Sequence, residues 1–235
     1  KNFPLSRSRF TRHSASVSAD LLAPLLRSPR LIEEADALNR ILAEEHQRRL
    51  KFHEEITDEA KWEFINGHVI MHSPAQNRHN RVVFRLANLL GNWVNLRQLG
   101  QVTVEKTLCQ FPRNDYEPDL VFFSQPKAKL IRADTLLHPV PDFIVEVLSP
   151  ATAANDRGVK FEDYAAHGVG EYWIVDPARE TLEQFLLKEG AYPKTVKRLK
   201  TGSVTSAVIA GLEIPVRALF DDPANLAALR RMLGA

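Results

Sequence analysis

Two acidic residues interrupt apolar runs in the middle of the chain, and a lysine follows them. Asp119 opens the run 120–123 (LVFF), Glu146 lies inside the run 142–148 (DFIVEVL), and Lys160 comes shortly beyond. A buried carboxylate is costly unless it is paired or binds a metal. Mg²⁺ prefers such carboxylates, and a metal so held can neutralise charge on a phosphate and activate water. The pattern therefore predicts a magnesium-dependent phosphodiesterase site, with the lysine stabilising the transition state.

Side-chain alternation distinguishes the two acids. In 142–148, Glu146 shares a face with Ile144 and Leu148, and the opposite face is also apolar, so this strand is expected to be covered on both sides. Burial favours a functional Glu146 over a structural one. Asp119 follows Pro118, which also fits a turn-forming aspartate near the mouth of a sheet. Asp142 is interpreted as a residue at the start of its strand.

The lysine lies on a predicted helix. Asp156, Lys160 and Tyr164 are four residues apart and share one helical face. That face could be a solvent-exposed ion pair, or it could direct Lys160 back over the strand ends.

Two further residues are candidates. Glu63 precedes a predicted hairpin and is either a further acid near the metal or an exposed strand residue. His79 is a possible catalytic residue, but it shares the apolar stripe of a predicted helix, where a lone histidine is more often a core group.

The predicted elements form one α/β domain around a mixed sheet. A helix is expected over 28–53, and Asn66-Gly67 between short apolar runs indicates a hairpin. The clearest helix covers 75–98, with Gly100 near its C-cap, and another covers 155–167 and ends at Gly168. The other predictions are strands over 101–110, 117–123, 142–148, 171–177, 181–188 and 193–199, and a short helix over 222–232.

Composition sets broad limits. The chain has 235 residues, 44% of them hydrophobic and 26% charged, with a net charge of +2. This is an ordinary globular composition, which permits nucleic-acid binding without arguing for it. Cys109 is the single cysteine, so an intrachain disulfide and a cysteine zinc cluster are excluded, in keeping with the cytoplasm. No segment has the ~20 apolar residues of a membrane span, so no membrane role is expected.

The amino-terminal segment differs from the rest. Residues 1–30 are rich in arginine and serine and contain a single acid, Asp20. A flexible basic arm is favoured, although organelle targeting also fits this composition. The predicted organisation is a basic arm and helical extension over 1–54, followed by one domain over 55–235.

Several segments together resemble a known family. They are 62–67 (WEFING), 117–119 (EPD), 141–150 (PDFIVEVLSP) and 164–177 (YAAHGVGEYWIVDP), with His79, Asp156 and Lys160 between them. This pattern, over about residues 55–200, is similar to the Uma-type putative restriction endonucleases of the PD-(D/E)xK nuclease superfamily. The resemblance implies a restriction-endonuclease-like core of helix, three strands, helix and strand. It also implies a divalent metal at Asp119 and Glu146, with Glu63 as an additional acid.

One position departs from the superfamily's pattern. Leu148 stands two residues after Glu146, where the superfamily has its lysine, so the resemblance suggests that this role has moved to Lys160. The leading hypothesis is a magnesium-dependent endonuclease, with Mn²⁺ as a possible substitute. DNA is the favoured substrate, and a homodimer is expected because cutting a duplex takes two sites. The alternative is a catalytically inactive module of nuclease fold that binds nucleic acid or protein.

Overall fold

The computed structural model describes residues 19–57, 61–193 and 197–234. The chain divides into two compact units, Lys1–Glu44 and Glu45–Ala235. The first unit contains α1 (Ala19–Leu26) and the beginning of α2 (Leu31–Glu55), which matches the helix expected over 28–53. Most of the basic arm expected over 1–30 lies outside the described residues. The domain division expected after residue 54 stays a prediction.

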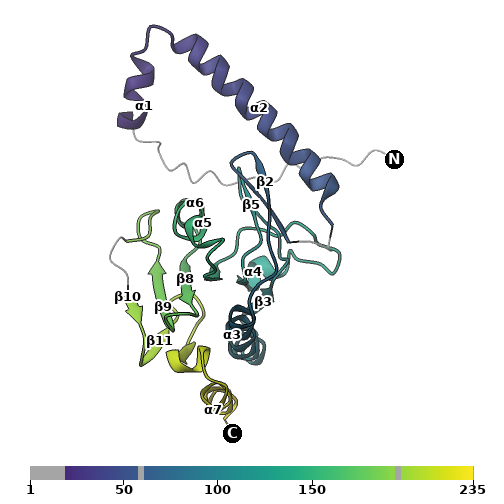
Figure 1. The fold of residues 1–235 in the computed structure, drawn as a ribbon, viewed down its shortest axis with the longest axis vertical. Helices are drawn as coiled ribbons and strands as arrows, with labels where there is room; N and C mark the ends of the chain where they lie inside the picture. The colour runs from purple at the N-terminus through teal and green to yellow at the C-terminus, as the bar shows by residue number, and fades with distance from the viewer. Residues whose placement is uncertain (1–18, 58–60, 194–196, 235) are drawn as a thin grey trace. The chain divides into compact units, whose positions relative to one another are not determined.

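A six-stranded mixed sheet forms the centre of the second unit, in the order β10-β9-β8-β7-β6-β3. Figure 1 labels β3, β8, β9 and β10 of this sheet. Its strands β7 and β8 are parallel, and every other neighbouring pair is antiparallel. The strands are β3 (Gly100–Val104), β6 (Leu120–Ser124), β7 (Phe143–Val147), β8 (Glu171–Asp176), β9 (Thr181–Leu186) and β10 (Lys197–Leu199). The predicted α/β class with a central mixed sheet is confirmed.

Strand β7 is covered on both faces, as its apolar alternation predicts. Phe143, Val145 and Val147 pack into one core, whereas Ile144 packs into another. All five residues of β7 are buried, including Glu146. A carboxylate in such a strand has to find its partners within the protein.

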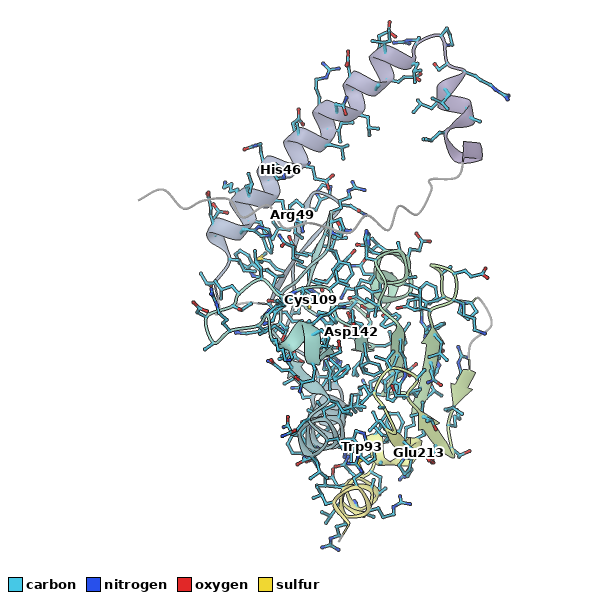
Figure 2. The ribbon with its side chains drawn as sticks, turned by 180° about the vertical axis from the view of Figure 1, so that it is seen from behind. His46, Arg49, Trp93, Cys109, Asp142 and Glu213 are labelled. Atoms are coloured by element: carbon cyan, nitrogen blue, oxygen red, sulfur yellow. The ribbon has the colours of Figure 1, made fainter. Side chains whose placement is uncertain are left out.

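Different helices supply the two cores. The first core receives the apolar stripe of α3 (Asn77–Leu96), together with α7 (Asp222–Leu233), the 3-10 helix η1 (Val216–Leu219) and the ribbon of β11 (Ser203–Thr205) and β12 (Glu213–Pro215). Trp93 on α3, labelled in Figure 2, donates a hydrogen bond from Nε1 to the carbonyl of Ala210 at 3.0 Å. The second core receives α6 (Val159–Ala166), which follows α5 (Ala153–Arg157). A short helix, α4 (Gln125–Ala128), follows β6.

A second sheet has the order β2-β1-β5-β4. Its strands are β1 (Trp62–Ile65), β2 (His68–Met71), β4 (Cys109–Gln110) and β5 (Asp115–Tyr116). The predicted hairpin is confirmed: β1 pairs with β2, and Asn66 and Gly67 have φ of 49° and 82°, as a two-residue hairpin turn requires. This turn places Glu63, in the middle of β1, inside the domain.

Three local predictions are wrong. The strand expected over 101–110 ends at Val104, because Glu105 and Lys106 both have positive φ and redirect the chain into the second sheet. The helix expected over 155–167 is interrupted at Gly158, whose backbone is not helical, so α5 and α6 are separate. Gly100 is not a C-cap; it lies in β3, where a Cβ would meet the carbonyl oxygen of Phe123 at 2.0 Å.

None of the helices in the described residues has the length and apolar character that crossing a bilayer would take.

Candidate active site

Lys160 lies at the centre of a buried group of acids. Its Nζ is 2.9 Å from Oε1 of Glu63, 3.0 Å from Oε1 of Glu146 and 3.4 Å from Oδ1 of Asp156. The lysine is 2% exposed, so the solvent-facing ion pair that the sequence left open is not what forms. Helix α6 directs Lys160 towards β7, and the hydroxyl of Tyr164, one turn later, donates to Oε1 of Glu146 at 2.9 Å.

Asp119 lies just before β6 and is tied to the neighbouring strand. Its Oδ2 accepts a hydrogen bond of 2.8 Å from the backbone N–H of Val147, the residue after Glu146. Its Oδ1 is 2.9 Å from Nζ of Lys61 and 3.4 Å from Nε2 of His79. The carboxylate is therefore fixed at the end of the sheet, beside the strand that carries Glu146.

A group that could hold a metal ion surrounds Asp119. His79, Glu105 and Asp119 each offer a ligand atom, and these atoms lie within 4.8 Å of one another. Nε2 of His79 is 3.8 Å from Oε1 of Glu105, and Nδ1 of His79 is buried and has no hydrogen-bond partner among the described residues. Two carboxylates and an imidazole are a donor set that suits divalent ions.

Burial and neighbouring charges shift the pKa values of the site's acids in opposite directions. Burial raises the pKa of Glu146 to about 8, even though Lys160 opposes this shift. Burial also acts to raise the pKa of Glu63, but Lys160 and His72 outweigh it and hold that pKa at about 2. The pKa of Asp119 falls well below its usual value, because hydrogen bonding to His79 and the charge of Lys61 exceed the effect of burial.

The same acids raise the pKa values of the basic groups in the site. Burial lowers the pKa of His79, but its contacts with Asp119 and Glu105 prevail and raise it to about 10. The pKa of Lys160 lies well above its ordinary value, because Glu146, Glu63 and Asp156 outweigh the cost of burial. The site therefore pairs each of these buried acids with a cation, and the pKa of Glu146 stays raised.

The residues singled out from the sequence fall into two adjoining contact groups. Lys160 contacts both Glu63 and Glu146, and Asp119 contacts His79. The hydrogen bond from Val147 to Asp119 links the two groups. The metal-binding and catalytic roles expected of these five residues stay predictions, because contacts alone do not assign a role.

Sequence reasoning missed two residues of the site. Glu105 was assigned to the interior of a strand, yet it lies at the strand's end and its Oε2 is 3.2 Å from Nζ of Lys61. Lys61 precedes β1 and contacts Asp119 across 58 positions of sequence. The sequence signal for Lys61 was its position directly before Trp62 and Glu63. That position does not indicate where its long side chain lies.

A solved structure shares this fold. It is the crystal structure of a "putative nuclease belonging to DUF820" from Anabaena variabilis, with a TM-score of 0.62 and 17% sequence identity, over 76% of this chain and 96% of that one. A search of curated proteins found no match.

A family profile also matches the chain. The profile carries the description "Putative restriction endonuclease" and matches residues 43–217, which include every residue of the two contact groups. The chain therefore belongs to the Uma2 family of that description.

Proposed function

We propose that this protein is a metal-dependent endonuclease that hydrolyses phosphodiester bonds of DNA. The observation that carries the proposal is the proximity of Asp119, Glu146 and Lys160, which come from three different places in the sequence. Lys160 contacts Glu146, and Asp119 accepts a hydrogen bond from the backbone N–H of Val147, the residue after Glu146. Phosphodiester hydrolysis needs the parts gathered there: oxygen ligands for a divalent ion and a positive charge near the reacting phosphate.

Asp119 and Glu146 would hold the ion. Both hydrogen bonds that described residues make to the Glu146 carboxylate end on Oε1, which leaves Oε2 for a ligand. One or two carboxylates, completed by phosphate and water, are the usual protein contribution to Mg²⁺ binding. The position between Asp119 and Glu105 suits the ion less, because the ammonium of Lys61 contacts both carboxylates there. Of the pair Asp119 and Glu146, it contacts Asp119 but makes no described ion pair with Glu146.

Glu63 has a different part in this proposal from the one expected of it. Its Oε1 contacts Lys160 and accepts the backbone N–H of Glu117 at 2.9 Å, and its Oε2 is 3.0 Å from Nε2 of His72. Its Oε1 is therefore engaged twice within the protein, whereas its Oε2 lies beside an imidazole but has no hydrogen-bond partner among the described residues. Glu63 is proposed as a positioning residue that fixes the ammonium of Lys160 beside Glu146.

The bound ion, Mg²⁺ or Mn²⁺, would supply Lewis-acid polarisation of the phosphate and activation of the attacking water. Lys160 places positive charge where the phosphate becomes more negative, and Tyr164 fixes the orientation of Glu146. Water attacks phosphorus in line, the bond to the leaving oxygen breaks, and the products are a phosphate monoester and a hydroxyl. Cutting both strands of a duplex takes two such sites, so a homodimer is part of the proposal.

A cleavage assay tests the function. The wild-type chain, Asp119→Asn and Glu146→Gln would be incubated with supercoiled DNA, a linear duplex, single strands and RNA, each with Mg²⁺ or Mn²⁺. We expect wild-type DNA cleavage that chelation abolishes, and losses of at least about 100-fold in both variants, equivalent to about 2.7 kcal/mol of transition-state stabilisation.

Glu162→Gln is the matched control. It removes the same charge from an exposed position of α6, the helix that carries Lys160, and should cleave as the wild type does. Undiminished cleavage by Asp119→Asn and Glu146→Gln would exclude the assigned site. A wild-type chain that binds DNA without cutting it would favour the alternative, an inactive binding module.

A further inference from the structure

A cavity of about 250 Å³ borders the proposed active site. Its walls come from the start of α3, the segment after β7 and the turn between β8 and β9. Its lining residues include Arg78, His79, Leu148, Asp176, Ala178 and Arg179. His79 joins the cavity to the site, because its Nε2 is 3.4 Å from Oδ1 of Asp119, and Leu148 lies two residues after Glu146.

The charges around the cavity favour an anion. Arg78 and Arg179 supply two permanent positive charges, against one carboxylate, that of Asp176. Asp176 is occupied by the protein: it accepts hydrogen bonds from the backbone N–H groups of Ala178 and Arg179 and pairs with the Arg179 guanidinium at 2.9 Å. The Arg179 side chain is 79% exposed and can contact a ligand while it stays paired.

Helix α3 adds to this preference. In the part of the chain that is described, the first turn of this 20-residue helix contains no acid, and Gln76 makes no side-chain capping hydrogen bond. The amino end of a helix carries partial positive charge and unpaired N–H groups, which favour anions. The 8% exposed His79, whose Nδ1 lacks a partner among the described residues, also lines the cavity.

The volume indicates what fits. Pockets that enclose a whole small-molecule ligand usually have about 300–1,000 Å³. A cavity of about 250 Å³ suits one unit of a longer ligand, such as the phosphate and sugar of a single nucleotide. Continuity with the active site through His79 favours a ligand that extends from one to the other.

We propose that this cavity binds a backbone phosphate of the DNA strand next to the scissile phosphate, with Arg78 and Arg179 as its direct contacts. The inference rests on the proposed function, because the DNA strand that it places in the cavity is the proposed substrate of the adjoining active site. These arginines bind and orient the strand and take no part in bond cleavage. They should add affinity without base preference, since phosphate contacts carry no sequence information.

Fluorescence anisotropy of a labelled oligonucleotide tests the inference, as duplex and as single strand, over a range of salt concentrations. EDTA is present, so the measurement depends on neither metal nor cleavage. Arg78→Ala and Arg179→Ala should each weaken binding about five-fold or more and should reduce the slope of log K against log salt by about 0.9 for the duplex.

Two further variants make the result specific. Arg132→Ala removes an equally positive side chain, 80% exposed and paired with Asp134, and should bind as the wild type does. Ala178→Trp keeps the charge but fills the cavity, and it should weaken binding about as much as the arginine substitutions. Circular dichroism verifies that each variant is folded.

Wild-type affinity in Arg78→Ala and Arg179→Ala would overturn the inference, as would an equal loss in Arg132→Ala or no DNA binding by the wild type. The cleavage assay distinguishes failure of this inference from failure of the proposed nuclease function. Cleavage that persists with full affinity in the arginine variants would reject only the cavity. Selective loss of binding, in a protein that cuts nothing, would support the cavity and reject the nuclease function.

Discussion

Nζ of Lys160 lies 3.0 Å from Oε1 of Glu146, although the lysine is on α6 and the glutamate is on β7. Leu148, directly after β7, occupies the position two residues after Glu146, where the nuclease superfamily that the sequence resembles has its lysine. The contact shows that a lysine from the following helix reaches the same acid. The break at Gly158 makes α6 a helix of its own, starting at Val159 directly before this lysine.

Substitution of Lys160 should destabilise the protein strongly. Lys160→Met keeps much of the side-chain volume but leaves Glu63, Glu146 and Asp156 without their shared cation, and breaking a buried ion pair costs about 3–5 kcal/mol. Urea unfolding would measure the loss. The matched control is Lys51→Met, because Lys51 is 71% exposed and pairs with Glu55 on α2; it should cost about 0.5 kcal/mol or less. A cost below about 1 kcal/mol for Lys160→Met would show that the acids do not depend on this lysine.

Two glycines should respond to alanine in opposite directions. A Cβ at Gly100 would lie 2.0 Å from the Phe123 carbonyl oxygen, so Gly100→Ala must push β3 away from β6 and should cost at least about 3 kcal/mol. At Gly91, inside α3, a Cβ meets no described atom within 4 Å, and Gly91→Ala should stabilise by about 0.5–1 kcal/mol. Thermal unfolding of both variants measures this; equal effects would contradict the pairing of β3 with β6.

Glu183 should contribute to the loss of stability in acid. Burial acts to raise its pKa, but the guanidinium groups of Arg157 and Arg198, each with an N–O contact of 2.7 Å, prevail and hold the pKa below its usual value. A carboxylate with a depressed pKa stabilises the fold above its unfolded pKa of about 4.3, and this contribution is lost as pH falls through the folded-state pKa.

The substitution Glu183→Gln should therefore flatten the decline in unfolding free energy between about pH 5 and pH 3. Arg198→Ala, which removes one of the two cations, should flatten it partly. Urea unfolding at several pH values measures both. A wild-type slope in Glu183→Gln would mean that the ion pairs persist in the unfolded chain or do not form.

Local sequence patterns predicted much of the fold. The turn at Asn66-Gly67, the stripe of α3 and the two apolar faces of β7 depend on periodicity and backbone preference, which neighbouring residues determine. The same patterns singled out Glu146 as a candidate site residue, because a carboxylate in a strand covered on both faces requires a partner.

Contacts between distant residues could not be predicted in the same way. Lys61 reaches Asp119 from before β1, and Glu105 joins them because the chain turns at two consecutive residues with positive φ. Neither residue type favours that conformation, so the turn is imposed by the surrounding structure. The rest of the second sheet was missed for a different reason: β4 and β5 have two residues each and leave no periodicity to detect.

Titration of Mn²⁺ into the protein by calorimetry tests the central claim most directly, because it measures the proposed metal site without relying on turnover. The wild type should bind the ion, Glu162→Gln should match it, and Asp119→Asn and Glu146→Gln should each weaken binding about tenfold or more, since even residues that only support metal ligands contribute that much. Glu146→Gln that binds Mn²⁺ as tightly as the wild type would contradict the proposed site.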